Sequence, residues 1–100
     1  MNLAQIQVLN VNCFDLPAND RFKKGRGYSY VFVVRENPQD LTDWGYEDTW
    51  RMLNPKPEEI LTLGQTYIAE VARYLDGSTQ GNMLRAVNYY SNFKLYGGLE

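Results

Sequence analysis

The chain of 100 residues is 44% hydrophobic and 22% charged, a composition that excludes a disordered chain and predicts one globular domain over residues 1–98. Its formal net charge of −2 argues against indiscriminate binding of polyanions. The absence of histidine and the presence of one cysteine exclude a His-dependent triad, a His-ligated metal site and an intrachain disulfide.

The N-terminal half contains two segments with the pattern of strands. Residues 4–14 alternate between polar and apolar positions, with Asn10 and Asn12 as possible bulges. Turn-forming residues follow at 16–20. Residues 28–35 then form a run of β-branched and aromatic side chains, which suits a pleated, half-buried surface.

The middle of the chain is acidic and is then interrupted by prolines. From Glu36 to Asp48 there are five acids and no base. Residues 47–53 are predicted to form a short strand. Pro55 and Pro57 end it, because each proline removes a backbone donor.

Two structures are open for the stretch from Pro57 to Leu75. Apolar residues at spacings of three and four favour a helix that starts at Pro57. Gly64 and Thr66 oppose the helix, because each lowers helix propensity in its second turn.

In the alternative, which we adopt, residues 61–65 form a turn and residues 66–75 a strand. A loop beginning at Asp76-Gly77 then returns the chain as a strand over residues 83–95. The fold expected on this basis is mainly β, a small OB-like five-stranded barrel. The helix would instead give an α+β fold.

A basic and aromatic stretch precedes the second strand. Four of the ten cations lie within six positions, beside two aromatic rings and around Gly25. In the strand that follows, Tyr28, Tyr30, Phe32 and Val34 share one face, and Ser29, Val31, Val33 and Arg35 share the other. We assign the β-branched second face to the core and the tyrosine face to a stacking platform for bases.

Nothing in the sequence predicts an enzyme, a cofactor or a metal site. The serines have no histidine to activate them, and Cys13 lies in an apolar alternating run, which favours a buried structural thiol. The chain has no apolar run long enough to span a membrane and no signal-peptide pattern, so we expect a reducing, cytoplasmic location. We interpret Leu99-Glu100 as a cloning remnant.

The run Lys24-Gly25-Arg26-Gly27-Tyr28-Ser29 resembles the glycine-basic-tyrosine-serine segment of the filamentous-phage single-stranded-DNA-binding proteins. Leu63-Gly64-Gln65-Thr66-Tyr67, with the two strands that follow it, resembles their C-terminal half. The resemblance implies a dimeric five-stranded OB-like barrel that coats single strands cooperatively. It also implies a backbone contact from Arg26 and stacking by Tyr28, with Tyr30 beside them. The acidic segment has no counterpart in that family.

We therefore expect sequence-tolerant binding of single-stranded nucleic acid by a homodimer. The residues predicted to bind it are Arg21, Phe22, Lys23, Lys24, Arg26, Tyr28, Tyr30, Arg73 and Arg85. The alternative is a phage-type or mobile-element interaction protein, which would bind a protein partner through an acidic-aromatic surface around Trp44–Trp50.

Overall fold

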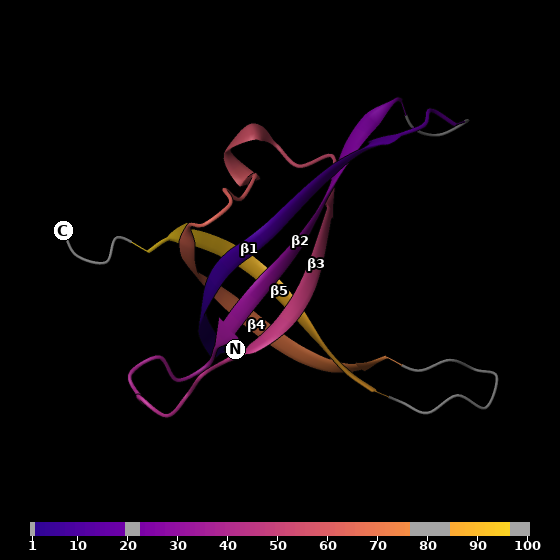
Figure 1. Cartoon of the computed structure of the whole chain (residues 1–100). Helices are drawn as coiled ribbons and strands as arrows, with labels where there is room; N and C mark the ends of the chain where they lie inside the picture. Colours follow the sequence, from indigo (N-terminus) through magenta and orange to yellow (C-terminus); the bar gives the residue numbers. More distant parts are fainter. Residues whose placement is uncertain (1, 20–22, 77–84, 97–100) are drawn as a thin grey trace.

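A computed structural model describes residues 2–19, 23–76 and 85–96, which form one antiparallel sheet of five strands (Figure 1). The order across the sheet is β3-β2-β1-β4-β5. The strands are β1 (Asn2–Leu16), β2 (Gly25–Arg35), β3 (Tyr46–Leu53), β4 (Thr66–Asp76) and β5 (Arg85–Leu95). The prediction of a mainly β, OB-like fold is confirmed, and the helical alternative is wrong.

The sheet curls until its two outer strands approach each other. In Figure 1, β4 and β5 pass behind β1, β2 and β3. No ladder joins β3 to β5, so the barrel is not closed by backbone hydrogen bonds. Side chains bridge this seam instead, as described below.

Two strands are longer by three or more residues than the sequence pattern predicts, and β3 and β4 are longer by one. β1 extends two residues beyond each end of the predicted 4–14, and its ladder with β2 shifts register between Val8 and Asn10, next to one of the predicted bulge positions. β2 begins at Gly25, three residues early. Gly25 and Gly27, expected in a loop, instead pair with Leu16 and Phe14 of β1.

The connection before β4 contains a short turn of 3-10 helix, η1 (Pro57–Glu59), and no longer helix. At the predicted turn, Gln65 N–H donates to the Thr62 carbonyl at 3.1 Å, and Gly64 has a φ of +85°. Only glycine adopts that φ readily. The predicted loop at Asp76-Gly77 and the predicted strand residues 83 and 84 lie outside the described residues, apart from Asp76, which ends β4.

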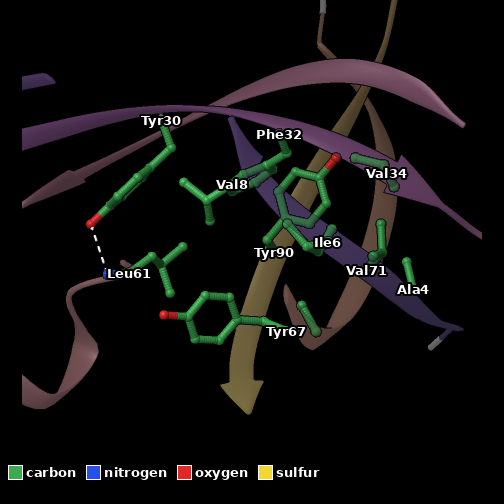
Figure 2. Packing of buried hydrophobic residues seen from close by; sticks show 11 residues of the cluster. Ala4, Ile6, Val8, Tyr30, Phe32, Val34, Leu61, Tyr67, Val71 and Tyr90 are labelled. Carbon is green, nitrogen blue, oxygen red and sulfur yellow. Dashed lines mark hydrogen bonds between the residues drawn. The ribbon is translucent and has the colours of Figure 1, made fainter. Parts of the chain in front are cut away.

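The core lies on the inner face of the curled sheet (Figure 2). Its members come from β1, β2, β4 and β5, with Leu61 from the connection after η1. They are Ala4, Ile6, Val8, Tyr30, Phe32, Val34, Leu61, Tyr67, Ala69, Val71 and Tyr90. Among the described residues no helix is long and apolar enough to span a bilayer.

The face of β2 that we assigned to the core is the wrong one. Tyr30, Phe32 and Val34 are each 0% exposed. The reason is the register: Val34 and Phe32 pair with Ile6 and Val8, the apolar positions of β1. Alternate residues of a strand share a face, so the tyrosine side of β2 must join them.

The prediction of a buried cysteine is also wrong. Cys13 is exposed, because β1 continues beyond the region that β4 covers. The ladder between β1 and β4 ends at Gln7, and Cys13 lies six residues further on, where β1 pairs only with β2.

Candidate nucleic-acid interface

The predicted basic residues are only partly described. Arg21 and Phe22 lie outside the described residues. Lys23 and Lys24 are exposed immediately before β2, and Arg26 is exposed within it. Arg26 is held in the sheet by Asn54 beyond the end of β3, whose N–H donates to the Arg26 carbonyl at 2.7 Å and whose Oδ1 accepts from Arg26 N–H at 2.9 Å.

The two tyrosines predicted to stack on bases lie differently. Tyr30 is completely buried, and its hydroxyl accepts a hydrogen bond from Leu61 N–H at 3.2 Å (Figure 2). Burial raises its pKa. Tyr30 is therefore a core residue that cannot reach a ligand, which corrects the prediction. Tyr28 is half-buried, and its ring centroid lies 6.3 Å from that of Tyr30 in a near-parallel arrangement.

Arg73 does not join this group. The Arg73 guanidinium forms an ion pair with Glu36, and its Nε donates to Asn88 Oδ1 at 2.8 Å. The Glu36 carboxylate raises the pKa of Arg73. Arg73 is thus held at the other end of β2, where Glu36 follows Arg35. Arg85 is the first residue of β5, and its side chain is outside the described part of the structure.

Two residues that sequence reasoning missed meet on the outer face of the sheet. The Phe14 ring covers Gly27, since a Cβ on that glycine would be 2.4 Å from the ring. The Arg51 guanidinium of β3 lies 5.5 Å from the centroid of the same ring. A cation over a ring face is attracted by the ring quadrupole. The absence of a side chain at Gly27 lets the two residues meet across β2.

We call the group formed by Lys23, Lys24, Arg26 and Arg51 the cationic end. Gly25 to Ser29 of β2 and the last residues of β3 lie together there, because Arg51 pairs with Ser29. Asp15 faces Arg26 across the ladder, so these five charged residues carry a net +3. None of the four cations forms an ion pair with a described residue.

The seam between β3 and β5 is held by a polar network. The Tyr90 hydroxyl donates to Asp48, and Asn88 Nδ2 donates to the Tyr90 hydroxyl at 3.0 Å and to the Tyr46 hydroxyl at 2.9 Å. Tyr46 in turn donates to Glu36 at 2.6 Å. Burial and the bond to Asp48 raise the pKa of Tyr90, and burial and the bond to Glu36 raise that of Tyr46. These contacts replace the missing ladder.

Two grooves flank the seam, and acids line both. One of about 710 Å³ includes Glu47 and Asp48 among its lining residues. The other, of about 640 Å³, is richer in aromatic rings but includes Glu58 and Glu59. Arg51 also lines both grooves and Arg73 lines the first, so the first groove has two acids and two arginines in its lining and its charge does not exclude a phosphate.

The acidic-aromatic surface around Trp44–Trp50 is not one surface. Trp44 is 86% exposed on the loop between β2 and β3. Trp50 faces inward, with its ring 5.3 Å from Tyr89 and 5.5 Å from Tyr90, edge to face. Trp44 and Tyr46, which is 42% exposed, are accessible, whereas Trp50 is half-buried.

Comparisons of the chain with protein-family models, with curated proteins and with solved structures gave no match. Among the described residues, no group of three or more Cys, Asp or Glu side chains is placed to hold a metal ion.

Proposed function

We propose that the chain binds single-stranded nucleic acid, with little sequence preference, through the cationic end. The observation that carries the proposal is the gathering of Lys23, Lys24, Arg26 and Arg51 at one end of the sheet, without an ion-pair partner among the described residues. Arg51 is moreover held in place by the ring of Phe14.

The chemistry follows from the residue types. Lysines and arginines neutralise phosphates and release counterions, which gives affinity that falls steeply with salt. Tyr28 and Phe14 supply rings beside these charges, on opposite faces of the β1–β2 ribbon because they pair with Cys13 and Gly27 respectively. Base stacking on such rings contributes about 1–3 kcal/mol per base and does not depend on base identity.

The position of the acidic segment supports the proposal. β2 runs from Gly25 to Arg35, so the loop that follows it lies at the opposite end of the strand from the cationic end (Figure 1). At a rise of about 3.3 Å per residue, eleven residues separate the two ends by about 35 Å. That distance is several Debye lengths at physiological salt, about 8 Å each. The three acids of that loop, Glu36, Asp40 and Asp43, therefore do not oppose a phosphate at Lys23 or Arg26. The other two acids of the segment, Glu47 and Asp48, lie in β3.

The test is a titration of fluorescein-labelled oligothymidylate, read by anisotropy at low salt. Lys23→Glu/Lys24→Glu is expected to weaken binding for all base compositions alike. Tyr28→Ala is expected to cost about 1–3 kcal/mol of binding free energy while the salt dependence stays that of wild type. The matched pair is Lys24→Glu and Lys94→Glu, one charge reversal each, because Lys94 lies on β5 away from the cationic end. Equal weakening by both charge variants would contradict a localised site.

A second candidate function is a protein–protein contact through the loop between β2 and β3. The observation that favours it is the exposure of Leu41 and Trp44, at 89% and 86%. Exposed large apolar side chains rimmed by polar residues mark interaction sites. The homodimer expected from the sequence remains a prediction.

A further inference from the structure

The loop over residues 36–45 presents two apolar side chains to water. Leu41 is 89% and Trp44 86% exposed. Burying an exposed tryptophan or leucine side chain contributes about 1.5–3 kcal/mol or more, so a partner that covers Leu41 and Trp44 would be bound favourably. We call residues 36–45, with these two side chains, the acidic tip.

Hydrogen bonds hold the backbone of the acidic tip in place. Arg35 Nε donates to the Asp43 carbonyl at 2.9 Å, and its Nη2 donates to the Pro38 carbonyl at 3.0 Å. The Asp43 carboxylate accepts from Asn37 N–H at 2.9 Å and from Gly45 N–H at 3.0 Å. None of these bonds uses the side chain of Leu41 or Trp44. A loop that is already ordered loses little conformational entropy when it binds.

The charge of the acidic tip indicates what would cover it. Glu36, Asp40 and Asp43 lie within it. Glu36 is paired with Arg73, so Asp40 and Asp43 are the acids of the tip without an ion pair to a described residue. Two of these carboxyls have lowered pKa values: that of Glu36 because Tyr46 and Arg73 hydrogen-bond to it, and that of Asp40 because Thr42 does. The complementary occupant is a cationic surface with some apolar area.

The chain itself carries such a surface. The cationic end holds a net +3, and Leu53, 60% exposed, pairs with Gly27 beside Arg51. The acidic tip and the cationic end lie at opposite ends of β2 (Figure 1), so they cannot meet within one molecule.

We propose that the acidic tip of one copy docks on the cationic end of a second copy. Trp44 would contact the exposed lysines and Arg51 through its ring face, as cations and indole rings attract each other. Leu41 would pack near Leu53. Because the two surfaces differ, the contact is head-to-tail; it either closes as an antiparallel two-fold dimer with two such contacts or repeats along a chain of copies, and the largest species in sedimentation distinguishes the two. The proposal requires no nucleic acid, although both ligands would compete for the same cations.

The test is sedimentation velocity over a range of protein concentrations at low and high salt. Wild type is expected to sediment faster as concentration rises at low salt, and to return to a single slow species at high salt. Leu41→Ser/Trp44→Ala leaves the charge and the bracing of the loop unchanged. It is expected to weaken association at least tenfold, while oligothymidylate affinity, measured at protein concentrations below those at which wild type associates, stays at the wild-type value. Sedimentation therefore reports on this inference and oligothymidylate affinity on the proposed nucleic-acid function, so failure of one is distinguished from failure of the other.

A mixing experiment tests the head-to-tail geometry. The variant Leu41→Ser/Trp44→Ala lacks a working tip, and Lys23→Glu/Lys24→Glu lacks a working cationic end. Neither is expected to associate alone. Mixed, they are expected to form a 1:1 pair that grows no further, because one tip and one cationic end remain intact. The control Lys94→Glu, on β5, is expected to associate as wild type does. Concentration-independent sedimentation of wild type at low salt, tip variants that associate normally, or the absence of pairing in the mixture would each overturn the proposal.

Discussion

Replacing Tyr30 by phenylalanine removes one oxygen atom from the core and leaves the ring in place. Tyr30 is 0% exposed and Leu61 3% exposed, and Leu61 N–H donates to the Tyr30 hydroxyl at 3.2 Å. Without the hydroxyl this buried N–H has no acceptor. A buried donor left unpaired costs about 1–3 kcal/mol, and no cavity term is added because the ring still fills its site.

The expected result is a lower melting temperature. For a domain of 60–100 residues, each kcal/mol shifts Tm by about 4–8 °C, so Tyr30→Phe is expected to melt at least about 4 °C below wild type by circular dichroism. The matched control is Tyr74→Phe, at a side chain that is 51% exposed, where the change should stay within about 0.5 kcal/mol. Equal melting temperatures for the two variants would refute the assignment of the Tyr30 hydroxyl as a core acceptor.

Three further predictions concern the seam, the acid range and the cysteine. Tyr90→Phe removes the hydroxyl bonded to Asp48, so we expect the free energy of unfolding to fall by about 1–3 kcal/mol. Relative to wild type, amide exchange should increase more in β3 than in β1. The pKa of Glu36 is lowered from 4.5 chiefly by the Tyr46 hydroxyl, so its contribution to stability is present above pH 4.5 and is lost as pH falls through the lowered pKa. Glu36→Gln should therefore lower the urea midpoint at neutral pH, and the difference in midpoint between the variant and wild type should become smaller in acid. A difference that does not change with pH would contradict this. Cys13 should react with a thiol reagent in the folded protein, whereas reaction only in urea would contradict its exposure.

The fold was largely predictable because the local signals agree. β-branched and aromatic runs, the prolines at 55 and 57 and the glycine at 64 divide the chain into strands and turns at nearly the observed places. Strand ends were less predictable. Gly25 and Gly27 look like loop residues, yet β2 includes them, because Phe14 of β1 covers Gly27 in place of the missing side chain.

The site was predictable only where it depends on adjacent residues in the chain. Lys23, Lys24 and Arg26 are close in sequence and close in space. Arg51 joins them through the register between β2 and β3, which no local pattern specifies. The face of β2 was predicted wrongly for the same reason: valines suit either face of a strand, and the decision came from the Ile6 and Val8 positions of its partner.

The Tyr90 and Asp48 contact was equally hidden, since it joins residues 42 positions apart across a seam with no ladder. A one-dimensional pattern indicates which side chains share a strand face. It does not indicate which two edges of a curled sheet approach each other. The signal that favours burial of Tyr90 is its aromatic ring alone, and Tyr89 beside it has the same ring and is 49% exposed.

The central claim is that the cationic end binds the phosphates of a single strand, and the salt dependence of oligothymidylate affinity tests it most directly. If Lys23, Lys24, Arg26 and Arg51 each neutralise one phosphate, the slope of log K against log salt is expected to be about −2.8, and Lys23→Gln/Lys24→Gln should bring it to about −1.4. The control Lys94→Gln, on β5, should keep the wild-type slope. A wild-type affinity that does not change with salt, or the absence of binding at low salt, would contradict the account.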